Sequence, residues 1–69
     1  MPCRLKSTNT SEGNKSALVI IEKQFGVLPF TALKQVGESV SDGYIISEIY
    51  TDQIVVTKGK TKIIINREP

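Results

Sequence analysis

The side chains that could do chemistry in this chain are few. The 69-residue sequence contains one cysteine, Cys3, and no histidine. A serine, cysteine or threonine nucleophile needs a base beside it, and histidine is the usual one. Three of the seven carboxylates, Glu38, Asp42 and Asp52, lie where turns are predicted, and turn carboxylates usually accept hydrogen bonds from backbone N–H groups. No residue set offers both a nucleophile and a base, so we predict no catalytic residue and no enzyme.

Metal and phosphate sites are equally poorly supported. One cysteine without histidine cannot supply a four-ligand zinc site within the chain. No acidic loop has the spacing that calcium requires. The five glycines stand singly, each explained by a turn, and do not form a phosphate-binding loop. We therefore predict no metal and no cofactor.

The basic residues give only a weak charge signal. The net charge is +2, and among nine basic residues only Lys58, Lys60 and Lys62 cluster. The simplest interpretation is a solvated hairpin tip. The alternative is a small barrel that binds single-stranded nucleic acid with these lysines and Tyr44 or Tyr50. Such a site needs a broad basic stripe with stacking aromatics, so we expect no nucleic-acid partner.

The elements that would position these residues are strands. Nine Ile, six Val and six Thr pack well on a pleated surface, whereas Ala and Leu number only two and four. The length allows one domain with a thin core, because a chain of this size buries only about 60% of its unfolded surface. No run approaches the roughly 20 apolar residues of a membrane span, and no signal peptide is visible.

Six short strands separated by turn signals are predicted, at the spacing of a small sandwich or barrel. They cover residues 4–7, 17–22, 27–31, 44–50, 53–57 and 60–66. Residues 8–15 are polar and contain Gly13 and Asn14, so we expect a flexible loop there. Residues 32–36 fit no element clearly, and a short irregular or 3₁₀ segment is the open alternative. The fold class is therefore all-β, a small sandwich or partly open barrel of about six short antiparallel strands in two sheets.

Spacing within the strands predicts which faces are buried. The continuous apolar run 18–21 suits a strand buried on both faces. Ile46 and Ile49 are three residues apart, which requires either a bulge or cover on both faces, and we favour cover on both faces. Lys58 and Gly59 are predicted to form a two-residue hairpin loop. In the last strand Ile63 and Ile65 should point inward, because a one-residue slip would bury two lysines.

Open sheet edges are the remaining functional surface. An edge strand presents unpaired N–H and C=O groups to which a partner can add a strand. The short first strand, 4–7, is the edge that we favour. Pro29 lacks an N–H and marks the third strand as another edge. Phe25, Val27, Leu28 and Phe30 lie within six positions, either as core residues or as an apolar patch at that edge.

Several segments, taken in order, resemble a known family. Residues 5–8 and 17–22 are similar to the first two strands of the homology-region domain of general secretion pathway protein C, the inner-membrane scaffold of type II secretion. The turn 36–40, the pair Ile46 and Ile49, residues 52–56 and Gly59 follow in that family's order. The type IV pilus lipoprotein PilP carries a related domain and is the second choice.

The resemblance implies a function as well as a fold. It implies one periplasmic domain of two small packed sheets, residues 1–69, taken from a longer protein anchored to the inner membrane by a segment absent from this chain. The domain would dock onto the first periplasmic domain of an outer-membrane secretin, alongside other secretion or pilus components. The implied partner-binding residues are Arg4, Leu5, Lys6 and Ser7, followed by Val27, Leu28 and Phe30.

Overall fold

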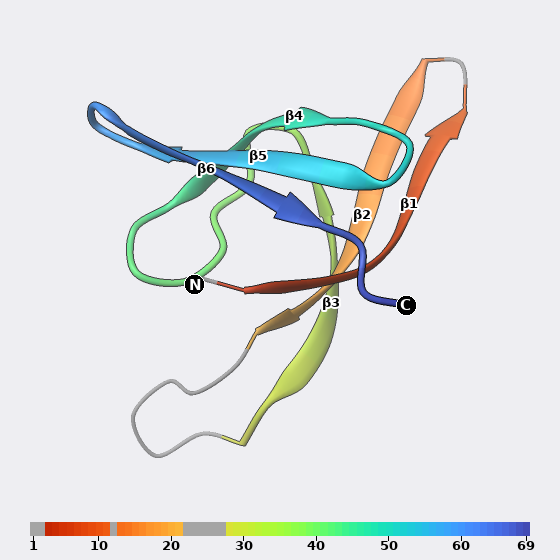
Figure 1. Ribbon diagram of the computed structural model, residues 1–69, viewed down its shortest axis with the longest axis horizontal. Helices are drawn as coiled ribbons and strands as arrows, with labels where there is room; N and C mark the ends of the chain where they lie inside the picture. The colour runs from red at the N-terminus through yellow and green to blue at the C-terminus, as the bar shows by residue number, and fades with distance from the viewer. Residues whose placement is uncertain (1–2, 12, 22–27) are drawn as a thin grey trace.

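The described chain folds into two layers of β-sheet. The computed structural model describes residues 3–11, 13–21 and 28–69. Six strands are present in this part of the chain: β1 (Arg4–Ser11), β2 (Asn14–Ile21), β3 (Phe30–Gln35), β4 (Ile45–Ile49), β5 (Gln53–Lys58) and β6 (Thr61–Asn66). They form two antiparallel sheets, ordered β1-β2-β3 and β4-β5-β6 (Figure 1). The predicted all-β class with two sheets is confirmed.

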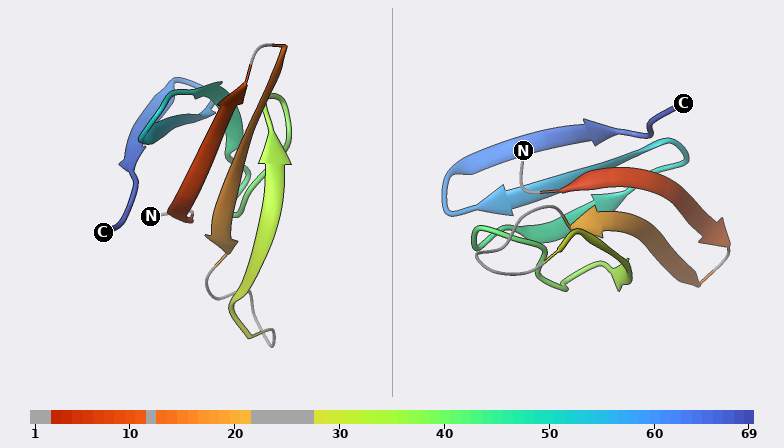
Figure 2. Two further views of the ribbon diagram at one scale, coloured as in Figure 1. Left: turned by 90° about the vertical axis from the view of Figure 1, so that its right-hand side faces the viewer. Right: turned by 90° about the horizontal axis from the view of Figure 1, so that it is seen from below.

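The core lies between the two sheets, which face each other in the side view (Figure 2). Both sheets contribute the largest fully buried side chains, which are Cys3, Leu5, Val19, Ile46, Ile49, Ile54, Val56 and Ile65. Each fully buried Ile, Leu or Val contributes about 1.5–3 kcal/mol relative to an exposed position. In β6 Ile65 is buried and Ile63 packs against the core, so the predicted inward face of this strand is confirmed.

Two corners join the sheets into a partly open barrel. At one corner Leu5 forms a parallel bridge with Arg67, and the Glu68 N–H donates to the Leu5 carbonyl at 3.0 Å. At the other corner the chain after β3 lies against β4. There the Gly37 N–H donates to the Ile46 carbonyl at 2.8 Å, and the Ile46 N–H donates to the Glu38 carbonyl at 3.0 Å. The two corners close only part of each sheet edge.

A β-bulge in β4 explains the spacing of Ile46 and Ile49. The β4–β5 register shifts between Ile46 and Glu48, so Ser47 is the extra residue. Its hydroxyl donates to the Val55 carbonyl at 3.2 Å. The bulge turns both isoleucines inward, and both are fully buried. Our preference for cover on both faces was therefore wrong at this strand.

Residues 8–15 are predicted to be a flexible loop, but those that the structure describes, 8–11 and 13–15, belong to the end of a hairpin. β1 continues to Ser11, and β2 begins at Asn14 after a turn in which Gly13 takes a φ of 81°. The backbone groups pair across the two strands, which satisfies them without an apolar face. Figure 1 shows this end of the hairpin reaching beyond the second sheet, so its side chains have no core to face. That position accounts for its polar sequence.

The third strand begins later than predicted. β3 starts at Phe30 and continues to Gln35, so most of the ambiguous stretch 32–36 is strand. Ile20 and Ile21 of β2 pair with Thr31 and Phe30, which sets the register. The last hairpin also differs by one position. Lys58 pairs with Thr61, so its two-residue loop contains Gly59 and Lys60 rather than Lys58 and Gly59.

Candidate protein-interaction site

The first strand places only part of the interface predicted for it on the surface. Leu5 is fully buried and belongs to the core cluster, so in this fold it cannot contact a partner. Arg4 is half-buried and binds Glu68 through two hydrogen bonds, Nε to Oε2 at 2.8 Å and Nη2 to Oε1 at 2.6 Å. Only Lys6 and Ser7 of the four predicted residues are exposed. The assignment of Leu5 to a binding surface is therefore corrected.

The outer edge of β1 is covered where it meets the second sheet. The C-terminal segment 67–68 lies against Leu5, and further along β1 the Thr8 hydroxyl donates to the Thr51 carbonyl. The Arg4 guanidinium, by hydrogen bonding to Glu68, lowers the pKa of that carboxyl below its ordinary value. The sequence could not show this cover, because it depends on residues more than forty positions away.

The outer edge of β3, unlike that of β1, has backbone groups that no described residue pairs with. The Gln35 N–H donates to Oε1 of Glu38 at 3.0 Å, and the Glu38 N–H donates to the Gln35 carbonyl at 3.1 Å. Gln35 therefore directs both backbone groups away from β2. Because these directions alternate along an antiparallel strand, Thr31 and Leu33 also direct their N–H and C=O groups away from β2. In the described part of the chain these four groups have no hydrogen-bond partner.

Large apolar side chains surround this open edge. Leu28 is 84% exposed, Leu33 67% and Phe30 46%. Leu28 and Phe30 were predicted binding residues, whereas Val27, predicted with them, lies outside the described residues. Leu33 was missed because it lies in the stretch that the sequence left ambiguous. The alternation of Phe30, Ala32 and Lys34 with Thr31 and Leu33 was the signal that could have found it.

An apolar outer face adjoins the open edge. Leu33 pairs with Leu18 of β2, and Leu18 and Ile20 are both half-buried on the face opposite Ala17, Val19 and Ile21. The predicted burial of this run on both faces is therefore only partial. In Figure 2 no element of the described chain covers this side of the β1-β2-β3 sheet. The edge and this face together form a continuous, partly apolar surface.

The outer edge of β6 is open too, but its composition is different. Residues flanking a two-residue hairpin loop form a hydrogen-bonded pair. The backbone N–H and C=O groups of Thr61 and Ile63 therefore point toward β5, and those of Lys62 and Ile64 point away from it. Lys62 lies on this edge and Lys60 lies in the hairpin loop at its end, and edge lysines oppose the addition of a further strand. Among the edges that the described residues leave open, β3 is the better candidate for docking.

Of the two tyrosines named for the nucleic-acid alternative, Tyr44 lies beside the basic cluster and Tyr50 does not. The Lys58 ammonium lies 5.8 Å from the centroid of the Tyr44 ring, so this ring already has a cation beside it. Tyr50 lies at the opposite end of β5, in the turn where its N–H donates to the Gln53 carbonyl at 2.8 Å. Tyr44 is therefore the tyrosine that lies beside the lysines, and its ring also packs against the core.

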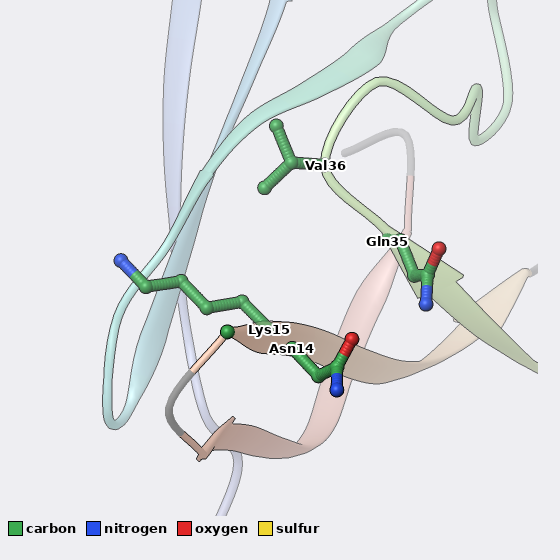
Figure 3. Close-up of a pocket in the computed structure, with 5 residues that line it drawn as sticks. Asn14, Lys15, Gln35 and Val36 are labelled. Carbon is green, nitrogen blue, oxygen red and sulfur yellow. The ribbon is translucent and has the colours of Figure 1, made fainter.

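A shallow cavity of about 210 Å³ lies beside the β1–β2 turn and is lined by Gly13, Asn14, Lys15, Gln35 and Val36. Ligand pockets are usually about 300–1,000 Å³ with converging polar groups. Figure 3 shows the Lys15 side chain pointing away from the amides of Asn14 and Gln35. The cavity therefore provides no evident small-molecule site.

The remaining groups to consider among the described residues are the Cys3 thiol and the possible metal ligands. Burial raises the pKa of the Cys3 thiol to about 11, which keeps it protonated at neutral pH. No three His, Cys, Asp or Glu residues of the described chain lie close enough to hold a metal ion. In the same residues, no helix has the length and apolarity to cross a membrane.

No protein-family model, curated protein or solved structure matches this chain. The candidate site therefore rests on the geometry of the β3 edge and the apolar side chains beside it.

Proposed function

We propose that this domain is a non-catalytic protein–protein interaction module that binds an extended segment of another protein along the outer edge of β3. The observation that carries the proposal is the set of four backbone groups on Thr31 and Leu33 that face away from β2 without a partner. An added strand would satisfy them through main-chain hydrogen bonds. The apolar side chains of Leu28, Phe30 and Leu33 lie where such a strand would pass.

The edge also sets what the partner strand must contain. Side chains of an added strand alternate between the two faces of the sheet. On the outer face they would lie beside Leu33, which favours an apolar residue there. On the other face they would lie beside Phe30, Ala32 and Lys34. Lys34 has no ion-pair partner among the described residues, so an acidic residue at that position of the partner would gain a contact.

The binding should be weak for one copy. Each main-chain hydrogen bond contributes a net of about 0.5–1.5 kcal/mol, and interfaces of small transient modules often bury less than about 1,200 Å². Many copies or membrane tethering would raise the effective concentration and the overall affinity. This behaviour suits a scaffold that holds the parts of a larger machine together.

We further propose that the partner is the first periplasmic domain of an outer-membrane secretin, in a secretion or pilus machine of the periplasm. Support for this partner comes from the ordered resemblance of residues 5–8, 17–22, 36–40 and 52–56 to the scaffold family. The docking surface proposed for it is now the β3 edge rather than the first strand, because Leu5 is fully buried.

The test is a titration of the ¹⁵N-labelled chain with that secretin domain, followed by chemical shifts. We expect the amide signals of Thr31 and Leu33 to move furthest. Leu33→Pro should abolish the shifts, because proline removes an outward N–H that the β2–β3 ladder does not use. The matched control is Lys62→Pro, which makes the same change on the β6 edge and should bind normally.

Two results would count against the proposal in different ways. No shift at high micromolar secretin domain would exclude this partner. Shifts that map to β1 or β6 and survive Leu33→Pro would show binding at a surface other than the β3 edge.

A further inference from the structure

The free backbone groups of the β3 edge are arranged symmetrically about one residue. At one end Pro29 has no N–H to donate. At the other end the backbone groups of Gln35 already bind Glu38. Between these ends only Thr31 and Leu33 offer free N–H and C=O groups. Thr31 and Leu33 lie one residue on either side of Ala32, and Pro29 and Gln35 lie three residues on either side of it. An edge with this symmetry can pair with a copy of itself.

We infer that a second copy of this chain pairs antiparallel with β3 along this edge, with the two-fold axis at Ala32. The inference rests on the β3 edge of the proposed function and names a further occupant for it, one that would compete with any other partner. The result is a continuous six-stranded sheet in the order β1-β2-β3-β3-β2-β1.

The hydrogen bonds of this register are complete. Thr31 of each copy faces Leu33 of the other, and the two residues exchange both N–H to C=O bonds. Four bonds form across the axis, and they use all of the free groups. Pro29 then faces Gln35 of the second copy, where neither residue has an N–H available. No outward-facing N–H group between residues 29 and 35 is left unpaired.

The neighbouring symmetric registers satisfy fewer groups. An axis at Leu33 would place Thr31 opposite Gln35, whose groups Glu38 already occupies, so the groups of Thr31 would stay unpaired. An axis at Thr31 would place the Leu33 carbonyl opposite Pro29, which has no N–H. The axis at Ala32 is therefore the register that the edge selects.

The side chains are compatible with the same register. The two Ala32 residues form a non-hydrogen-bonded pair, in which the Cα atoms come within about 4.5 Å and small side chains avoid a clash. Phe30 faces Lys34 of the second copy, which brings an exposed ring and a cation together. No like charges are opposed, because Lys34 is the only charged residue of the strand.

Disulfide trapping tests the register directly. In Ala32→Cys two thiols would face each other at a Cα separation that a disulfide can span. The matched control is Thr31→Cys. In this register each residue 31 faces Leu33 of the second copy, so the two thiols would be offset by two positions along the strands. Thr31 is exposed and Ala32 is half-buried, so random collisions would favour the control. Cys3 is buried and so does not react in the folded chain, and denaturation in excess alkylating reagent blocks it before it can exchange.

We expect Ala32→Cys to form a covalent dimer at least about tenfold faster than Thr31→Cys under mild oxidation. Sedimentation equilibrium of the unmodified chain should show association that increases with concentration, and Leu33→Pro should abolish it. Equal or faster cross-linking of Thr31→Cys would overturn the inference. So would an unmodified chain that stays monomeric at millimolar concentration, a result that does not depend on the folding of any variant.

Failure of this inference and failure of the proposed function give different results. A monomeric chain whose Thr31 and Leu33 signals still respond to the secretin domain would exclude only self-pairing. A chain that dimerises, but that does not respond to the secretin domain at concentrations where it is monomeric, would exclude only that partner.

Discussion

Shortening Leu5 to alanine tests the central correction that the structure makes to the sequence-based site. Leu5 is fully buried among the core residues of both sheets, and its replacement would leave a cavity. Buried Leu→Ala substitutions cost about 2.7–5 kcal/mol, and we expect about 3 kcal/mol here. A domain of this size has a free energy of unfolding of about 3–10 kcal/mol, so the loss is a large part of the total.

The expected change in melting temperature follows from the size of the chain. Unfolding entropy near the transition is about 2.1 cal/mol/K per residue, which gives about 0.145 kcal/mol/K for 69 residues. A loss of 3 kcal/mol then lowers Tm by about 20 °C. Because the chain has no tryptophan, far-UV circular dichroism is the suitable signal, with the fluorescence of its two tyrosines as a second probe.

Leu33→Ala is the matched control, because it makes the same chemical change at a side chain that is 67% exposed. We expect it to cost less than about 1 kcal/mol, since surface substitutions rarely cost more. Similar losses for the two variants, or a loss below about 1 kcal/mol for Leu5→Ala, would refute the placement of Leu5 in the core. The edge of β1 would then again be a candidate for docking.

Two further predictions concern titratable groups. The Cys3 thiol, with a pKa of about 11, should react with a disulfide reagent at pH 8 roughly a hundredfold more slowly in the folded chain than in denaturant, and equal rates would contradict its burial. The pKa of Glu68 is lowered by Arg4, so its contribution to stability is present above the unfolded pKa near 4.5 and is lost as the pH falls through the folded pKa. The free energy of unfolding, measured by urea denaturation between about pH 5 and pH 3, should therefore depend less on pH in Glu68→Gln than in the unmodified chain. The same pH dependence in both chains would contradict the pairing of Glu68 with Arg4.

The fold was largely predictable because its signals are local. β-branched runs and alternation placed most of β2, β5 and β6, and Lys60 and Lys62 indicated which face of β6 turns inward. The hairpin end at residues 8–15 was missed because its side chains meet no core and carry no apolar pattern. The bulge at Ser47 was considered but not preferred, because spacing alone does not distinguish an extra residue from a strand covered on both faces.

The candidate site was less predictable, because it depends on contacts between distant residues. Whether a strand is an open edge depends on what lies beside it, and the cover of Leu5 comes from Arg67 and Glu68 at the other end of the chain. The extent of the opening at Thr31 and Leu33 likewise depends on Glu38, because Glu38 occupies the outward backbone groups of Gln35. Pro29, and the apolar residues around it, were the local signals in the sequence that pointed to this edge.

The division of the chain into two contiguous meanders has a consequence for how it folds. All ladder contacts of β1-β2-β3 lie within residues 4–35, and all those of β4-β5-β6 lie within residues 45–66. Each half needs only hairpin-scale loops to close, and such closures are fast. The bridge between Leu5 and Arg67 instead closes a loop of almost the whole chain. Docking of the halves, rather than formation of either one, should therefore limit the folding rate.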